Sequence, residues 1–104
     1  MGRIAKRTRI EFSPQAQRDW KKLKKKIGKD TESDFNKALE AIAENPLNGK
    51  PLQENLSGYY GFRFAGHYRI VYEILEDEKG KLVSVCAIDD RKNIYRRGSR
   101  FFDF

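Results

Sequence analysis

Residues 67–74, with the sequence HYRIVYEI, constrain the fold more than any other part of the chain. Their valine, isoleucine and tyrosine residues favour a pleated and largely buried surface, so residues 68–75 are predicted to form the longest and central strand of a sheet. Arg69 conflicts with this setting, because a guanidinium keeps its proton and is costly to bury without a partner. The strand is therefore expected to be structural along its length and functional at Arg69.

Two further strands flank this segment. In residues 60–64 aromatic side chains alternate with other residues, and residues 82–88 form an alternating apolar run. Gly66 and the charged segment 76–81 are predicted to be the turns that join these strands. Strands joined by short hairpins are antiparallel neighbours, so the second half of the chain predicts an antiparallel sheet.

The first half of the chain predicts a strand and then a helix. Residues 8–12 are predicted to form a short first strand, after which Ser13 is the expected N-cap and Pro14 the first helical residue. Gly28 is predicted to end this helix. The apolar stripe of the helix consists of Ala16, Trp20, Leu23 and Ile27. Trp20 is interpreted as a core residue and not as a binding residue.

A second helix is predicted to begin at Asp30 or Thr31 and to end at Asn45, because the residue before Pro46 is disfavoured in the α region. Its apolar stripe consists of Phe35, Ala38, Leu39 and Ile42. The short connection between the two helices implies an antiparallel helical hairpin. Residues 47–57 contain turn signals and are predicted to be a loop.

The predicted element order is therefore β-α-α-β-β-β. This is an α+β fold in which an N-terminal strand and a helical hairpin pack on an antiparallel β-sheet. The hairpin is expected to cover one face of the sheet and to leave the other face partly open to a ligand. The length of 104 residues predicts one domain over residues 1–104, with residues 1–7 frayed.

The charge of the chain predicts a class of partner. The formal net charge is +7, which favours attraction to polyanions such as nucleic acid, or to acidic proteins. Basic residues concentrate in residues 1–29 and again from residue 91 onward. The alternative interpretation is a solvated basic surface that has no ligand.

Several kinds of site are not expected from this sequence. Cys86 is the single cysteine and His67 the single histidine, so neither an internal disulfide nor a structural zinc site is expected. No Gly-rich phosphate loop occurs, and no cofactor or metal is expected. Because no apolar run is long enough to cross a bilayer and no signal-peptide core occurs, a cytoplasmic location is predicted.

The candidates that remain for chemistry are three arginines and a tyrosine that are distant in the chain. They are Arg63, Arg69, Arg91 and Tyr95. Antiparallel strands could bring them to one face, where converging guanidiniums are costly unless an anion such as a phosphate lies between them. Tyr95 could stack on a base of single-stranded RNA. The alternative for Arg69 is an ion pair with Glu73 or another acid, and Asp89-Asp90 is interpreted as a polar strand end or an arginine partner.

Residues 9–97 resemble the RelE/ParE superfamily of small bacterial or archaeal toxins. The resemblance rests on residues 18–23 (RDWKKL), on residues 68–72 (YRIVY) and 90–95 (DRKNIY), and on Leu56, Tyr60 and Arg63. It implies the RelE-like branch, whose members are ribosome-dependent mRNA endoribonucleases. In that activity the 2′-hydroxyl of the RNA attacks the adjacent phosphate, and no metal is needed.

The resemblance also implies roles for individual residues. The catalytic set is Arg63, Arg69, Arg91 and Tyr95, in which Arg69 holds the phosphate. His67 is a possible general acid or base, because histidine side chains titrate near neutral pH, and is otherwise a turn residue. The cations expected to contact RNA are Arg18, Lys22, Lys25, Lys92 and Arg96. The sequence departs from RelE at Gly61, where RelE has a second lysine, and Lys92 is the candidate substitute.

Two alternatives to the nuclease stay open at this point. One is a ParE-like inhibitor of DNA gyrase that is not an enzyme, and the other is an inactive domain that only binds its partner. In each case the resemblance implies a cognate antitoxin, which is expected to be acidic and partly disordered before binding because the toxin is basic. The ribosome and mRNA are the other expected partners of the nuclease. The free toxin is expected to be a monomer.

Overall fold

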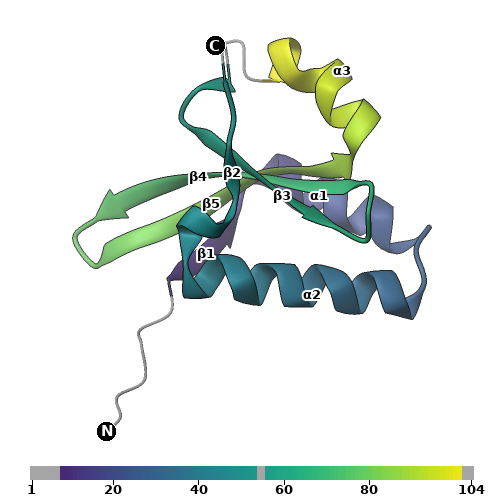
Figure 1. Cartoon of the computed structure of the whole chain (residues 1–104), viewed down its shortest axis with the longest axis horizontal. Coiled ribbons are helices and arrows are strands. Elements are labelled where there is room, and N and C mark those ends of the chain that lie inside the picture. The colour runs from purple at the N-terminus through teal and green to yellow at the C-terminus, as the bar shows by residue number, and fades with distance from the viewer. Residues whose placement is uncertain (1–7, 54–55, 102–104) are drawn as a thin grey trace, which may run out of the picture.

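The computed structural model describes residues 8–53 and 56–101, and it describes side chains as far as Arg97. The prediction for residues 1–7 lies outside the described residues. Five strands form one sheet in the order β1-β5-β4-β3-β2 (Figure 1). The strands are β1 (Arg9–Phe12), β2 (Lys50–Pro51), β3 (Tyr59–Phe64), β4 (Tyr68–Asp77) and β5 (Gly80–Asp90). The strand that carries Arg69 is the central one, as predicted.

The α+β fold with the order β-α-α-β-β-β is confirmed, with one refinement of the sheet. The pairs β3–β4 and β4–β5 are antiparallel hairpins, whereas β1 pairs with β5 in parallel, Arg9 opposite Leu82 and Phe12 opposite Val85. The sheet is therefore mixed. A short turn forces antiparallel pairing only on the two strands that it joins, and no such turn joins β1 to β5. The predicted loop 47–57 also contains the two-residue strand β2, which pairs with β3, and the 3₁₀ turn Pro46–Asn48.

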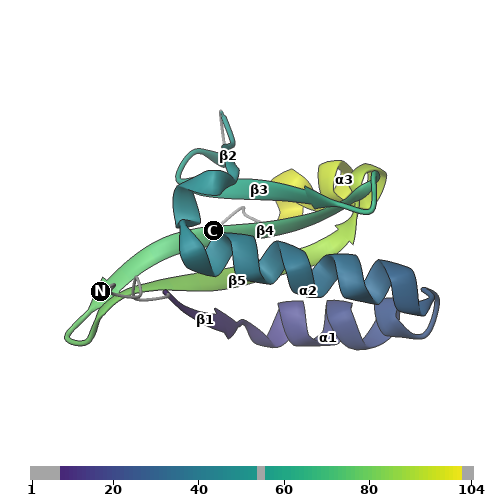
Figure 2. The same cartoon turned by 60° about the horizontal axis from the view of Figure 1, so that its bottom comes forward.

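Two helices cover one face of the sheet, as predicted, and we call this the hairpin face (Figure 2). They are α1 (Pro14–Lys24) and α2 (Lys29–Glu44). The Ser13 hydroxyl accepts a hydrogen bond from the backbone N–H of Ala16 at 3.1 Å and caps α1, as predicted. The prediction of the α2 cap was wrong, because the helix begins two to three residues earlier, with Gly28 at the N-cap position. Asp30 lies in the first turn, where its negative charge interacts favourably with the positive end of the helix dipole.

The main core lies between the hairpin and the sheet and is built on large aromatic rings. The Phe35 ring stacks on Trp20 with centroids 3.8 Å apart and meets Phe64 edge to face at 5.4 Å. Tyr72 is fully buried, and its hydroxyl donates to the Pro46 carbonyl and accepts from the Gly49 N–H at 3.0 Å. The interpretation of Trp20 as a core residue is confirmed.

A third helix lies on the opposite face of the sheet, which we call the α3 face (Figures 1 and 2). The segment after the last strand, for which the sequence predicted no helix or strand, is the 11-residue helix α3 (Arg91–Phe101). A small second cluster lies beneath it and contains Val71, Ala87 and Ile94. Because α3 covers only part of this face, polar side chains of the strands remain accessible beside it.

Candidate functional site

One end of the α3 face carries a row of charged side chains across three strands. Arg69 on β4 lies directly opposite Arg63 on β3 and, on its other side, opposite Asp89 on β5. Side chains of directly opposed residues share a face of the sheet. Arg69 is also two residues from Val71, which packs under α3, so the row belongs to the α3 face. Two like charges in direct opposition are unfavourable, and this makes the pair of arginines conspicuous.

The four residues predicted to be catalytic come together at this row. Burial lowers the pKa of Arg69, the positive charges of Arg63 and Arg91 lower it further, and Tyr95 acts in the opposite direction. The Arg91 guanidinium carbon lies 5.7 Å from the centroid of the Tyr95 ring. Tyr95 is 71% exposed, which is unusual for an aromatic side chain and leaves its ring free to meet a ligand. The prediction that these groups converge is therefore confirmed, while their catalytic roles stay predictions.

The strand end and the β3–β4 turn fix the start of α3. Asp90 caps the helix, with its carboxylate accepting from the backbone N–H of Asn93 at 2.8 Å. The backbone N–H of Arg91 donates to the carbonyl of His67 in the turn, also at 2.8 Å. The turn itself uses left-handed backbone at Ala65 (φ 50°) and Gly66 (φ 86°). The first residue of α3 is thus tied to the strands that carry the other arginines.

His67 lies in the exposed turn, beside the site but turned from it. Its ring packs against the ring of Tyr68 with centroids 4.3 Å apart, and Tyr68 in turn stacks on Phe64. Phe64 belongs to the hairpin-face core, on the opposite side of the sheet from Arg69. A role of His67 in proton transfer stays a prediction, and it requires the ring to turn away from Tyr68.

The alternative interpretation of Arg69 as an ion-paired residue finds no support in the structure. Within the described part of the chain, no carboxylate makes an ion pair with Arg69, whose guanidinium donates to the Tyr68 carbonyl at 3.2 Å. Glu73 lies elsewhere on the face, with one carboxylate oxygen 4.0 Å from the Cys86 sulfur. Burial, and then the charge of Glu73, raise the pKa of the Cys86 thiol to about 12. The thiol is therefore neutral at physiological pH.

Asp89 and Asp90 form part of the supports of the site. Asp90 is the α3 cap, and Asp89 accepts from Arg97 at 3.0 Å. Arg97 also pairs with Asp19 of α1 at 3.1 Å. The interpretation of the paired acids as a strand end and an arginine partner is confirmed. The link to Asp19 was not predicted, because 78 residues separate it from Arg97 and no local periodicity relates them.

The cations predicted to contact RNA form two groups on opposite faces of the sheet. All of them are exposed: Arg18, Lys22 and Lys25 at α1, and Lys92 and Arg96 on α3. Arg18 donates to Gln15 at 3.1 Å and Arg96 to Asn93 at 3.3 Å, within their own helices. The α3 group lies on the helix that carries Arg91 and Tyr95, so it is the group closer to the candidate site.

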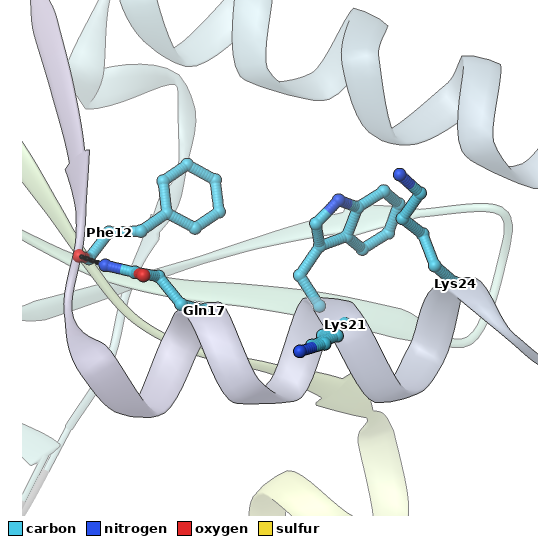
Figure 3. Close-up of a pocket in the computed structure, with 5 residues that line it drawn as sticks. Phe12, Gln17, Lys21 and Lys24 are labelled. Atoms are coloured by element: carbon cyan, nitrogen blue, oxygen red, sulfur yellow. Dashed lines mark hydrogen bonds between the residues drawn. The ribbon is translucent and has the colours of Figure 1, made fainter.

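A separate open hollow of about 470 Å³ lies beside α1, on the hairpin side (Figure 3). Apolar rings and two lysines line it, and its lining residues are Phe12, Gln17, Trp20, Lys21 and Lys24. It contains none of the predicted catalytic residues. In the described part of the chain there is no cluster of three or more potential metal-binding side chains, and no helix is both long and apolar enough to span a bilayer.

Comparison with known proteins agrees with this fold. Residues 10–95 match the family model described as the ParE toxin of the type II toxin–antitoxin system parDE. A search of curated proteins found no significant match. Among solved structures, the chain is similar to the toxin–antitoxin complex RelBE2 from Mycobacterium tuberculosis, with 27% identity and a TM-score of 0.61 over 84% of this chain and 100% of that chain.

Two further structures share the fold. The YoeB–YefM complex from Staphylococcus aureus is 28% identical with a TM-score of 0.60, covering 80% of this chain and 95% of that chain. A YoeB/ParE toxin from Agrobacterium tumefaciens is 14% identical with a TM-score of 0.66, covering 80% of this chain and 98% of that chain, and it speaks for the fold alone. Because the family model spans most of the sequence, the chain belongs to the ParE toxin family of type II toxin–antitoxin systems, within the RelE/ParE superfamily.

Proposed function

We propose that this toxin is a ribosome-dependent mRNA endoribonuclease that acts without a metal. The observation that carries the proposal is the charge around Arg69. The guanidiniums of Arg63 and Arg91 both act on this residue. Asp89, opposite Arg69 on β5, pairs with Arg97 instead, and no carboxylate of the described residues pairs with Arg69. Such a cluster of permanent positive charges is unfavourable in the free protein and becomes favourable when a phosphate enters it.

The chemistry that suits this site is transesterification within the RNA. The 2′-oxygen attacks the adjacent phosphorus, the bond to the 5′-oxygen breaks, and the products are a 2′,3′-cyclic phosphate and a 5′-hydroxyl. The proton of the 2′-hydroxyl passes to a base and another proton is delivered to the leaving oxygen. The RNA supplies both the nucleophile and the leaving group, so the protein has only to orient the phosphate, stabilise charge and move protons.

The proposed roles follow from the chemistry of each side chain. Arginines stay protonated and cannot act as bases at neutral pH, so Arg63, Arg69 and Arg91 are assigned to the negative charge of the transition state. Tyr95 carries a hydroxyl that can exchange a proton and a ring that can stack on a base. His67 is the other candidate for proton transfer. The exposed cations of α1 and α3 are assigned to the RNA backbone of the ribosome or the message.

A second candidate function is non-enzymatic inhibition of DNA gyrase, which the ParE description of the matching family model favours. That function requires a binding surface and does not require the convergence of three guanidiniums and a phenol. A supercoiling assay with purified gyrase separates the two candidates.

The proposed partner in the cell is a cognate antitoxin. One similar structure is described as the toxin–antitoxin complex RelBE2, and another as the YoeB–YefM complex. With a net charge of +7, this toxin suits an acidic segment that folds on binding and covers the arginines. The toxin is proposed to work in the cytoplasm, where translating ribosomes are found, and to be a monomer when free.

Induced expression followed by primer extension on translated mRNA tests the nuclease. Wild type is expected to create new message ends, and Arg69→Ala is expected to lower cleavage about 100- to 1000-fold because one charge-stabilising donor is lost. Arg9→Ala is the matched control, since Arg9 is an arginine at the distant edge strand that pairs with Asp77 at 2.7 Å. The proposal fails if wild type arrests growth without new message ends, and gyrase inhibition in the supercoiling assay would then support the second candidate.

A further inference from the structure

The last residues of β5 have an edge that no strand covers in the described part of the chain. The parallel partner β1 ends opposite Val85, because the chain then turns at Ser13 into α1. The backbone N–H of Ile88 therefore lacks a strand partner on that side. It donates instead to the carboxylate of Asp19 on α1 at 3.0 Å. A helix side chain thus completes the edge of the sheet at the point where the candidate site begins.

Arg97 of α3 crosses the same edge and joins three elements. One guanidinium nitrogen lies 3.0 Å from Asp89 on β5, and another lies 3.1 Å from Asp19 on α1. Asp19 is only 9% exposed and also accepts from Gln15 at 2.9 Å. A buried carboxylate is costly unless it is ion-paired and hydrogen-bonded, and Asp19 is both. We call Asp19, Asp89 and Arg97 the clamp.

The clamp holds α3 beyond its first turn, where the other contacts of the described residues end. Asp90 and the His67 carbonyl fix the first residues of the helix, and Ile94 packs on the small second cluster. Arg97 follows one turn later and is the last described side chain that joins α3 to the body of the protein. Tyr95 lies two residues before it, and Arg91 and Tyr95 share one side of the helix.

We propose that Asp19 and Arg97 are positioning residues of the phosphate site. They fix the orientation of α3, so that Arg91 and Tyr95 stay beside Arg69. This inference rests on the proposed nuclease for its effect on activity. It also separates the arginines of α3 by role, because Arg97 is occupied by two carboxylates and serves the helix, whereas Arg91 faces the ligand.

The competing explanation is that Arg97 is one more cation that binds RNA. Asp19→Asn distinguishes the two, since asparagine keeps an oxygen for the Ile88 N–H and removes the charge that holds Arg97, while Gln15 loses its acceptor. If Arg97 positions the helix, Asp19→Asn and Arg97→Gln both lower the maximal cleavage rate by about 10- to 100-fold, because small misplacements at a reacting centre are costly. The apparent affinity for mRNA-programmed ribosomes changes by less than about twofold. The double variant is no slower than the slower single variant, because both remove the same contact.

If Arg97 binds RNA, the two variants should change affinity in different ways, and that result would overturn the inference. Arg97→Gln would then weaken affinity, and Asp19→Asn would leave affinity unchanged or improve it by freeing the arginine. Arg97→Lys gives a milder second variant in case Asp19→Asn unfolds. Lysine keeps the charge and cannot bridge two carboxylates with a planar fork, so we expect a loss of at least about fivefold, and a wild-type rate in this variant contradicts the inference. Glu40→Gln, an exposed carboxylate-to-amide change on α2, is the matched control.

Amide hydrogen exchange tests the clamp independently of any nuclease activity. In Asp19→Asn and Arg97→Gln we expect the amides of residues 94–97 to exchange at least about tenfold faster, while the amides of α2 keep their protection. Unchanged protection of α3 refutes the clamp even if the wild type cleaves mRNA. Failure of the wild type to cleave mRNA refutes the nuclease and leaves the exchange result to decide on the clamp.

Discussion

The two faces of the sheet are built on different principles. The hairpin face buries stacked and edge-to-face aromatic rings around Phe35, under two helices. The α3 face buries the small residues Val71 and Ala87 and one larger residue, Ile94, beneath a single helix. Among the described side chains, ion pairs and hydrogen bonds, and not further apolar area, hold the rest of that helix.

This difference separates stability from function within one small sheet. Because side chains alternate along each strand, Arg69 can point to one face while Ile70 and Tyr68 pack on the other. The well-packed face supplies the free energy that holds three strands in register. The other face can then hold two opposed arginines, an arrangement that disfavours folding and is tolerated because the hairpin face offsets it.

The difference in stability between the two faces can be tested by removing one large residue from each core. Phe35→Ala is expected to cost about 3–5 kcal/mol of unfolding free energy, because the ring contacts Trp20 and Phe64 and leaves a large cavity. Ile94→Ala is expected to cost roughly 2 kcal/mol, because α3 can relax over the gap. Chemical denaturation of both variants provides the measurement. An equal or larger cost for Ile94→Ala contradicts the view that the hairpin face carries the stability.

The residues of the candidate site were better predicted from the sequence than those that hold them in place. Period-2 alternation placed Arg63 and Arg69 on one face, and the hairpin between them made them neighbours. The helical stripes likewise predicted α1, α2 and the core position of Trp20. These are local signals, and each can be read within a window of a few residues.

No local sequence pattern predicts the contacts that hold the candidate site in place. The parallel pairing of β1 with β5 and the contact of Asp19 with Arg97 join residues more than 70 positions apart. The length of α3 was also missed, because its sequence is charged and offers only Ile94 as an apolar contact within the described side chains. Tertiary contacts hold this helix, and such contacts become visible only once the fold is known.

The hydroxyl of Tyr95 provides a sharper test of the α3 face itself. Tyr95→Phe keeps the ring beside Arg91 and removes only the group that can carry a proton. If the hydroxyl transfers a proton, cleavage of ribosome-bound mRNA is expected to fall at least about 100-fold. Tyr60→Phe on the hairpin face is the matched control. If Tyr95→Phe keeps wild-type activity and Tyr95→Ala loses it, the ring acts only by stacking. Proton transfer must then be carried out by another group such as His67.

A substitution of Tyr72 tests the hairpin face, since it should lower the stability of the fold and leave the cleavage rate per folded molecule unchanged. Its hydroxyl satisfies the buried N–H of Gly49 and donates to the Pro46 carbonyl. Tyr72→Phe is expected to cost about 1–3 kcal/mol in thermal or urea unfolding, because a buried donor loses its partner. Tyr60→Phe is again the control, because no hydrogen bond to its hydroxyl occurs within the described residues. A loss of cleavage per folded molecule in Tyr72→Phe contradicts the separation of the two faces.

The smallest expected effect concerns Gly61, where RelE has a lysine. Gly61 lies opposite Val71 and two residues from Arg63, so a side chain at this position points to the α3 face beside the arginines. A Cβ there meets only the flexible end of Leu52 at 3.4 Å, and the backbone is not left-handed, so the fold should accept a lysine. Gly61→Lys adds a fourth cation next to the phosphate, and we expect cleavage to rise severalfold, with Gly61→Gln as the uncharged control. If Lys92 already supplies this charge, Gly61→Lys leaves the rate unchanged and Lys92→Ala lowers it. That outcome would mean that Lys92 on α3, and not a residue of the sheet, supplies the positive charge that RelE has at the position of Gly61.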